Sequence, residues 1–288
     1  MKKSITFFIL LILAFKVNYA KYEFKYKLNV PDIKHELPAI LNEVSGISDI
    51  DFTRVALIQD ELGIVFIYDF IKGEILSQHK FEETGDFEGL AFTGNSIYIL
   101  RSDGRLSEWR NFMSDSAELI NYYLDLKTNN NEGLCFDSKH NRVLIAAKSK
   151  PRSHDLKEER FIYSFDLNTK KLLDNPLYSL NVSEVQKLAD KLNIHFDLIS
   201  AKGKQKAFNF RPASIAIHPI SDEIYIISAV EKLILIMNRK GDLVHIEKLD
   251  EQLFLQAEGI TFLPDGTMII TNEARGKQPT LLVFKMKE

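Results

Sequence analysis

Short apolar runs separated by polar or glycine turns dominate the chain. The first clear set lies at residues 45–50, 54–59, 64–70 and 74–81. Apolar runs of this length, bounded by turn residues, are typical of β-strands. Around residues 183–193 the pattern changes, because Val185, Leu188, Ala189 and Leu192 recur at helical spacing behind Ser183, which we expect to cap a helix. The chain is therefore predicted to be all-β with one short helical insertion.

These runs form a repeat, because the same phrase opens successive sets. Its copies are Val44-Ser45-Gly46-Ile47, Phe87-Glu88-Gly89-Leu90, Asn131-Glu132-Gly133-Leu134, Pro212-Ala213-Ser214-Ile215 and Ala257-Glu258-Gly259-Ile260. Their second residues stand at 45, 88, 132, 213 and 258, so the steps are 43, 44, 81 and 45 residues. A period near 44 is typical of four-stranded propeller blades. We predict five blades, with a degenerate sixth inside the long step as the alternative.

The last blade is incomplete at the end of the chain. The second, third and fourth sets are predicted at residues 88–126, 132–180 and 214–249, but the fifth offers only three strands, at 258–263, 267–271 and 280–286. A missing outer strand would leave an exposed edge. The alternating, aromatic segment 22–30 has no other place, so we predict that it completes the last blade and closes the ring.

The first twenty residues have the features of a signal peptide. Lys2 and Lys3 precede the apolar stretch 5–15, and Ala20 offers a small residue at the cleavage site. That stretch is about half of the roughly 20 residues that a spanning helix needs. We expect cleavage after Ala20, one propeller domain over residues 21–288, and a periplasmic location. An uncleaved leader would instead hold the protein at the inner, plasma membrane.

Composition narrows the choice of partners and chemistry. The 37 basic and 40 acidic residues give a net charge of -3, which provides no large field for nucleic acid. The single thiol, Cys135, cannot form an internal disulfide and is expected to be buried. None of the seven His residues pairs with another at metal-ligand spacing, and no nucleophile elbow or phosphate loop occurs, so no catalytic residue is assigned. His218 should lie at the mouth opposite the repeated phrases, and the basic loop 202–206 is expected to be a solvated face, with a docking patch as the alternative.

Acidic side chains are expected to gather at one mouth of the central channel, where first strands begin and second strands end. Converging carboxylates must be hydrated, protonated, paired with Arg or Lys, or bound to a cation. Oxygen ligands of this kind suit calcium. The predicted metal ligands are Glu43, Asp60, Glu88, Glu132, Glu258, Asn272 and Glu273. The structural alternative is that each Glu accepts hydrogen bonds from neighbouring blades, with Arg101, Lys148 and Arg211 neutralising the cluster.

The ordered strand heads resemble the SdiA-regulated (YjiK/CarP-like) family of bacterial envelope β-propellers. The resemblance rests on the segments 43–48, 86–91, 131–137, 211–219 and 256–262, followed by Asn272-Glu273. It implies an exported or membrane-associated propeller with a link to calcium and no firmly established catalytic role. The chain departs from the family at Arg101-Ser102-Asp103 and Lys148-Ser149-Lys150, where the family tends to place an acidic residue.

Two functions of different classes follow. The preferred one is a non-enzymatic envelope propeller that binds a protein or small-molecule partner at its acidic mouth, with calcium as a structural or sensing ion. The alternative is a calcium-dependent hydrolase of the phosphoesterase or lactonase type, which would use the same carboxylates to hold metal and activate water. A metal-free scaffold, with Arg and Lys side chains in the channel mouth, is a third reading.

Overall fold

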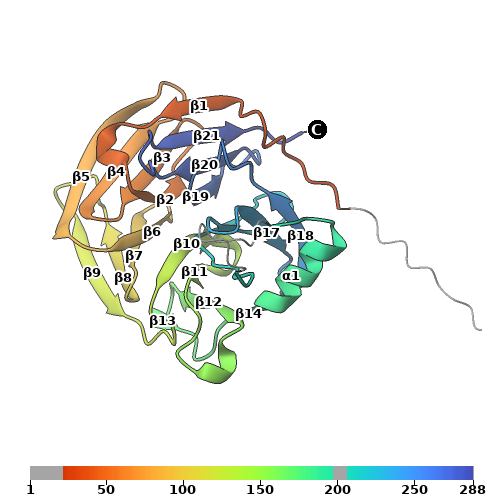
Figure 1. Ribbon diagram of the computed structural model, residues 1–288. Helices are drawn as coiled ribbons and strands as arrows, with labels where there is room; N and C mark the ends of the chain where they lie inside the picture. Colours follow the sequence, from red (N-terminus) through yellow and green to blue (C-terminus); the bar gives the residue numbers. More distant parts are fainter. Residues whose placement is uncertain (1–21, 197–205, 288) are drawn as a thin grey trace, which may run out of the picture.

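The computed structural model describes residues 22–196 and 206–287, which form a five-bladed β-propeller (Figure 1). The predicted leader at residues 1–20 and positions 202–205 of the basic loop lie outside the described residues. Five antiparallel sheets stand around a central axis. The prediction of five blades is therefore confirmed, and the long step between the third and fourth repeats carries a helix in its described part instead of a sixth sheet.

Within each blade the strands run outward from the axis in chain order, except that β1 forms the outer edge of the last blade. The first blade contains β2 (Val44–Asp49), β3 (Arg54–Gln59), β4 (Leu62–Asp69) and β5 (Glu74–Thr84). The second contains β6 (Phe87–Phe92), β7 (Ser96–Arg101), β8 (Arg105–Arg110) and β9 (Glu118–Tyr123). The third contains β10 (Asn131–Asp137), β11 (Arg142–Ala147) and β12 (Glu159–Asp166), with both β13 (Lys171–Leu172) and β14 (Tyr178–Asn181) paired to β12.

The remaining two blades follow the same plan. The fourth contains β15 (Ser214–Ile217), β16 (Ile224–Ser228), β17 (Leu233–Met237) and β18 (Leu243–Lys248). The last contains β19 (Ala257–Phe262), β20 (Met268–Asn272), β21 (Thr280–Phe284) and, at its outer edge, β1 (Ile33–Glu36). Three short 3-10 helices, at Ala39–Leu41, Ser138–His140 and His154–Leu156, lie in connecting segments.

The two ends of the chain close the ring, as predicted, but with a different segment. β1 pairs antiparallel with β21, so that Ile33 lies opposite Val283 and Glu36 opposite Thr280. The predicted closing strand, residues 22–30, was placed too early. Its alternating aromatic residues serve packing: Tyr26 and Leu28 are buried among side chains of the fourth and last blades.

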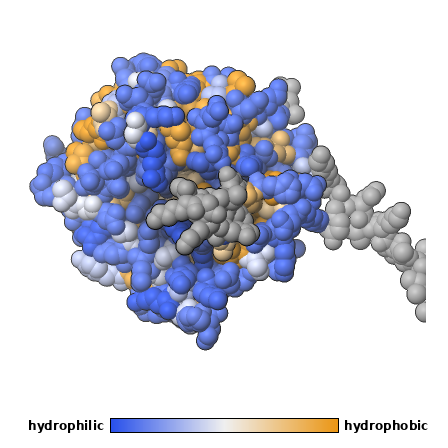
Figure 2. Space-filling view, in the orientation of Figure 1, coloured by the Kyte–Doolittle hydropathy of each residue, from blue (hydrophilic) through white to orange (hydrophobic). Residues whose placement is uncertain are grey.

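The core lies between neighbouring blades and is built from their facing surfaces. Ile227 of the fourth blade and Ile270 of the last, for example, belong to one buried cluster and are fully inaccessible. Because each inner strand packs against a blade on either side, its side chains are apolar on both faces, which explains the continuous apolar runs of the sequence. The outer rim of the face seen in Figure 1 is mainly hydrophilic (Figure 2).

The helical insertion is α1 (Val182–Lys191), close to the predicted 183–193. It packs beside β14 and β18 through Val182, Val185 and Ala189 (Figure 1). The cap is Asn181 and not Ser183, because the Asn181 side chain accepts hydrogen bonds from the backbone N–H groups of Ser183 and Glu184. Among the described residues there is no helix of the length and apolar character needed to cross a membrane.

Candidate functional site

β-Bulges place three glutamates at one mouth of the channel. In four blades the pairing of the first two strands skips one residue within the repeated phrase, and the skipped residues are Ser45, Glu88, Glu132 and Glu258. A bulged residue is left out of the ladder, and its side chain is re-aimed. The repeat therefore has a physical meaning, because the phrase marks the bulge that turns a side chain toward the channel mouth.

The glycine after each bulged residue is required by close packing of the inner strands. A Cβ atom on Gly89 would lie 2.6 Å from the carbonyl oxygen of Glu132, and one on Gly46 would lie 2.9 Å from the Cα of Gly89. Neither distance leaves room for a side chain. These glycines therefore let the inner strands of neighbouring blades approach closely at the axis.

Two further charged side chains come from the ends of second strands. Lys148 follows β11 and Glu273 follows β20, at the positions where those strands meet the bulges of β10 and β19. Together with the bulged glutamates they form a group that we call the acidic mouth, and its members are Glu88, Glu132, Lys148, Glu258 and Glu273. The sequence predicted the four carboxylates of this group as metal ligands and raised Lys148 only as a neutralising alternative.

Lys148 is the central cation of the acidic mouth. Its Nζ lies 2.7 Å from Oε1 of Glu132, which also accepts a hydrogen bond of 3.1 Å from Nδ2 of Asn130. The other oxygen of Glu132, Oε2, is buried and has no hydrogen-bond partner among the described residues. Glu132 is only 3% exposed, so this oxygen is a buried acceptor without a donor.

Glu273 and Glu258 belong to a second part of the mouth, on the last blade. Nε2 of Gln256 donates to Oε2 of Glu273 at 2.5 Å, and the Arg275 guanidinium lies 3.9 Å from the same oxygen. Glu258 is 6% exposed. The two carboxylates of the last blade are thus contacted mainly by the neutral amide of Gln256 and by a long ion pair from Arg275.

Burial and mutual repulsion hold these carboxyls partly protonated. Burial, followed by the charge of Glu132, raises the pKa of Glu88 to about 9. Burial and the charge of Glu258 raise the pKa of Glu132 and that of Glu273 to about 7. Burial also raises the pKa of Glu258, whereas Lys148 opposes the rise. The mouth therefore holds more carboxyls than one ammonium can neutralise.

The other three predicted ligands lie at the edge of this group. Burial and the neighbouring Glu43 carboxylate raise the pKa of Asp60 to about 7, and its Oδ1 has no hydrogen-bond partner in the described part of the chain. Glu43 itself is exposed. Asn272 is fully buried and its Nδ2 donates to the Thr280 hydroxyl of the next strand, leaving its Oδ1 without a partner among those residues. The charge of Asp60 contributes to the raised pKa of Glu273.

No three His, Cys, Asp or Glu side chains of residues 22–196 and 206–287 are arranged to hold a metal ion. The acidic mouth instead presents four carboxyl groups around one lysine, and among them Oε2 of Glu132 has no partner in the described part of the chain. Such a site can accept a positively charged or hydrogen-bond-donating group without first losing its own ion pair. A metal ion that used both oxygens of Glu132 would have to displace Lys148 from Oε1.

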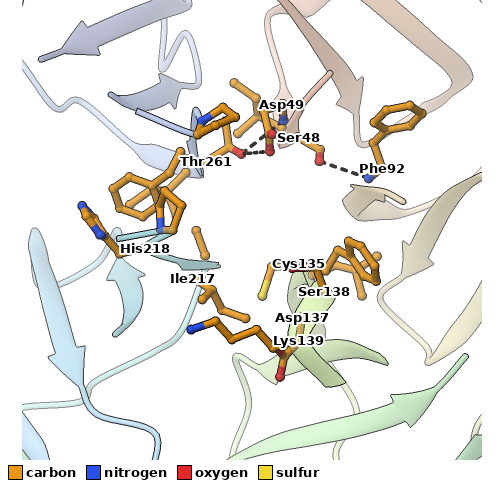
Figure 3. A pocket seen from close by; sticks show the side chains of 18 of the residues that line it. Ser48, Asp49, Phe92, Cys135, Asp137, Ser138, Lys139, Ile217, His218 and Thr261 are labelled. Atoms are coloured by element: carbon orange, nitrogen blue, oxygen red, sulfur yellow. Dashed lines mark hydrogen bonds between the residues drawn. The ribbon is translucent and has the colours of Figure 1, made fainter. Parts of the chain in front are cut away.

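The opposite mouth holds a cavity of about 310 Å³ lined by the far ends of the inner strands (Figure 3). Asp49, Cys135, Asp137, His218 and Thr261 contribute to it from four different blades. Cys135 is buried, as expected, and burial raises the pKa of its thiol. The Thr261 hydroxyl donates to Oδ1 of Asp49 at 2.9 Å. His218 therefore lies at the mouth opposite the repeated phrases, as predicted.

The hydrogen bonds of His218 define its tautomer. Its Nδ1 accepts from the backbone N–H of Ser221 at 3.0 Å and of Ile220 at 3.3 Å, so the ring proton is on Nε2. Nε2 donates to the Tyr26 hydroxyl at 2.7 Å, which in turn donates to the carbonyl oxygen of Gly266 at 2.6 Å. Burial lowers the pKa of His218, so the ring is neutral. This chain of bonds is satisfied throughout and holds the N-terminal segment in place.

Asp137 anchors a closed ion network on the same side. Its carboxylate, fully inaccessible, accepts from Arg142 Nε at 2.9 Å and from both terminal nitrogens of Arg239 at 2.9 and 3.0 Å. These guanidinium groups hold the pKa of Asp137 below its ordinary value in spite of burial. The network joins the third blade to the turn of the fourth, which indicates a structural role.

A protein-family model described as SdiA-regulated matches residues 19–275. The chain belongs to the SdiA-regulated family. The resemblance inferred from the strand heads is thus confirmed, and no curated protein matches the sequence at a significant level.

Solved structures that resemble this SdiA-regulated propeller share its fold at low identity. The glutaminyl cyclase of Myxococcus xanthus is 12% identical, with a TM-score of 0.58 over 90% of this chain and 96% of its own. A luciferin-regenerating enzyme is 9% identical, with a TM-score of 0.51 over 89% and 95%. A streptogramin B lyase is 13% identical, with a TM-score of 0.49 over 88% and 97%. These likenesses concern the fold alone.

The three basic residues that the sequence offered as possible neutralisers of the cluster, Arg101, Lys148 and Arg211, have separate roles in this SdiA-regulated chain. Nε of Arg101 donates to Oδ1 of Asp103, two residues along the chain, at 3.0 Å. Lys148 neutralises the acidic mouth. Arg211 lies with Lys150 in a basic cavity beside the acidic mouth, which the sequence did not reveal because the charged residues of the cavity come from three separate segments.

Proposed function

We propose that this SdiA-regulated propeller is a non-enzymatic binding protein of the bacterial cell envelope, whose acidic mouth receives a positively charged group of a small molecule or protein partner. One observation carries the proposal: Glu88, Glu132, Glu258 and Glu273 surround one ammonium, that of Lys148. Buried carboxylates are costly unless they are protonated or paired. A bound cation would replace the protons that these groups otherwise retain.

Calcium is the first inorganic candidate, because the unpartnered atoms are oxygens. Oδ1 of Asp60, Oε2 of Glu132 and Oδ1 of Asn272 have no donor in the described part of the chain. Calcium accepts six to eight oxygen ligands with loose geometry. An organic ammonium group is the second candidate, since it could bond to Oε2 of Glu132 while Lys148 keeps Oε1.

Thermal unfolding of the mature chain tests the cation site. A cation that binds only the folded state raises the melting temperature with its concentration. We expect a rise with millimolar calcium or with an alkylammonium salt, and a loss of that rise in Glu258→Gln. Glu36→Gln is the matched control, because Glu36 is exposed on β1. A rise unaffected by Glu258→Gln, or no rise with either cation, would refute a site at this mouth.

The same samples address the hydrolase alternative. If calcium binds, turnover of p-nitrophenyl phosphate and of a chromogenic lactone is measured with and without calcium. The hydrolase alternative predicts calcium-dependent turnover that Glu258→Gln abolishes. Turnover of this kind would replace the binding proposal with the hydrolase. Envelope location is tested separately, by fractionating cells that express the full chain and by determining whether the mature N-terminus is Lys21.

A further inference from the structure

A second cavity, of about 580 Å³, opens beside the acidic mouth. Its walls come from the residues that follow β11, from the start of β12 and from the segment that leads to β15. Its charged lining residues are Lys148, Lys150, Lys157, Glu158, Arg160 and Arg211. We call it the basic cavity. Its size is in the ordinary range for small-molecule sites.

Arg160 is the buried element of the basic cavity. It is 5% exposed, and its hydrogen bonds go to uncharged oxygens only: Nε to Phe210 O at 2.8 Å, Nη1 to Lys157 O and Glu159 O at 3.1 and 2.7 Å, and Nη2 to Asn209 Oδ1 at 2.5 Å. These bonds use four of the five N–H groups of a guanidinium. Buried arginines are usually paired with a carboxylate. Here the positive charge is held in place without being neutralised.

The other cations of the cavity are exposed and available. The side chains of Lys150, Lys157 and Arg211 make no hydrogen bond or ion pair with the described residues. Lys148 is committed to Glu132. The cavity therefore contributes four positive charges that are not balanced by a contacting carboxylate.

Nearby carboxylates are few and mostly engaged. Glu158 lines the cavity and is exposed. Glu159 accepts from Ser179 at 2.6 Å and from Asn181 at 2.7 Å, on the outer side of the blade. Glu231 accepts from Ser228 at 2.6 Å. Among the described residues that line the cavity, Glu158 is thus the one acidic residue, and it faces the four unneutralised cations Lys150, Lys157, Arg160 and Arg211. The net charge of the lining is therefore strongly positive.

We propose that the basic cavity binds the phosphate group of a small phosphorylated molecule. A fixed guanidinium with a spare N–H, flanked by a free guanidinium and two flexible ammonium groups, suits a compact dianion with several acceptor oxygens. A phosphate group would occupy part of the cavity, and the remaining space would hold the rest of the molecule. This proposal does not depend on a cation at the acidic mouth, although Lys148 borders both sites.

The experiment uses phenyl phosphate and benzoate as probes, titrated by calorimetry into the mature protein at physiological salt. We expect phenyl phosphate to bind at least tenfold more tightly than benzoate, and Arg211→Gln and Lys150→Gln each to weaken it at least fivefold. Both residues are exposed, so these variants should unfold like the wild type. Lys240→Gln, which removes an exposed charge from the turn after β17, is the control.

Three results would overturn the proposal of a phosphate site in the basic cavity. Equal affinity for benzoate would mean a general anion site, and equal weakening by Lys240→Gln would mean an effect of net charge alone. Binding that survives both cavity variants would place the phosphate elsewhere. Glu258→Gln separates the two proposals, because it should abolish the cation effect at the acidic mouth and leave phenyl phosphate binding within twofold of the wild type.

Discussion

The Nζ atom of Lys148 lies 2.7 Å from Oε1 of Glu132, at the end of β11 and the bulge of β10. This ion pair joins adjacent strands of one blade at the point where the glutamates of three blades converge. The charges of Glu258 and Glu132 raise the pKa of Lys148 in spite of its burial, so the ammonium is retained. Lys148 therefore determines how much negative charge the acidic mouth can hold.

Removing this ammonium should destabilise the fold in a pH-dependent way. Lys148→Met leaves Glu132 and Glu258 without their cation, and breaking a buried pair from one side costs roughly 3 kcal/mol. We expect that loss in urea unfolding at pH 8 and a smaller loss at pH 5, where the carboxyls can be protonated. Lys240→Met should change stability little at either pH. Equal losses at both values would indicate lost packing instead of lost charge.

The raised carboxyl pKa values predict how stability varies with pH. Glu88, with a pKa of about 9, is protonated in the folded protein at pH values where it is ionised in the unfolded chain. The folded state then binds more protons, so this contribution is full below about pH 4.5 and is lost as pH rises toward 9.

Glu88→Gln isolates that contribution, because Gln resembles the protonated carboxyl and does not titrate. The variant should match the wild type near pH 5 and be more stable than it at pH 9, as measured by urea unfolding at several pH values. Glu36→Gln should follow the wild-type curve throughout. If Glu88→Gln became less stable than the wild type with rising pH, the carboxylate would be the favoured form and the mouth would be better compensated than the structure indicates.

The glycine after the bulge should tolerate no side chain. In Gly89→Ala the new Cβ would lie 2.6 Å from the carbonyl oxygen of Glu132, on the inner strand of the next blade. Overpacking against backbone costs roughly 1–3 kcal/mol. Gly94→Ala is the comparison, because Gly94 has a φ of +92° but no atom near its Cβ position, so only backbone strain of roughly 1–2 kcal/mol applies. Urea unfolding should rank Gly89→Ala as the more destabilised variant, and the reverse order would contradict close packing at the axis.

The sequence predicted those features that repeat and missed those that depend on a single contact between distant segments. The phrase around Glu88 and Glu132 recurs because four of the five blades carry the same bulge, so its spacing revealed both the number of blades and the convergence of the glutamates. The pairing of Lys148 with Glu132 was one alternative among several, since the choice depends on side-chain geometry.

Two misses have different physical causes, one local and one long-range. Asn181 and Ser183 are both good capping residues, and only the backbone direction after β14 decides between them. The basic cavity brings Arg160 beside Arg211, which are 51 positions apart, because the segment before β15 returns across the third blade. Neither the periodicity nor the composition of the sequence indicates that this segment packs against the third blade.

Truncation of the N-terminus distinguishes the predicted closing strand from the observed one. A chain that starts at Pro31 keeps β1 and loses Tyr26 and Leu28, whose burial contributes roughly 1.5–3 kcal/mol each. It should fold with reduced stability and keep the oligomeric state of the full mature chain. A chain that starts at Pro38 also loses β1, which uncovers the edge of β21.

β21 is buried throughout and is apolar apart from Thr280, and an uncovered apolar edge strand pairs readily with other chains. The chain that starts at Pro38 should therefore aggregate or lose cooperative unfolding, as measured by light scattering after size exclusion and by urea unfolding. The full mature chain is the control for both. If the Pro31 start already caused aggregation and the Pro38 start added nothing, segment 22–30 would be the element that closes the ring, and the pairing of Ile33 with Val283 would be unimportant for closure.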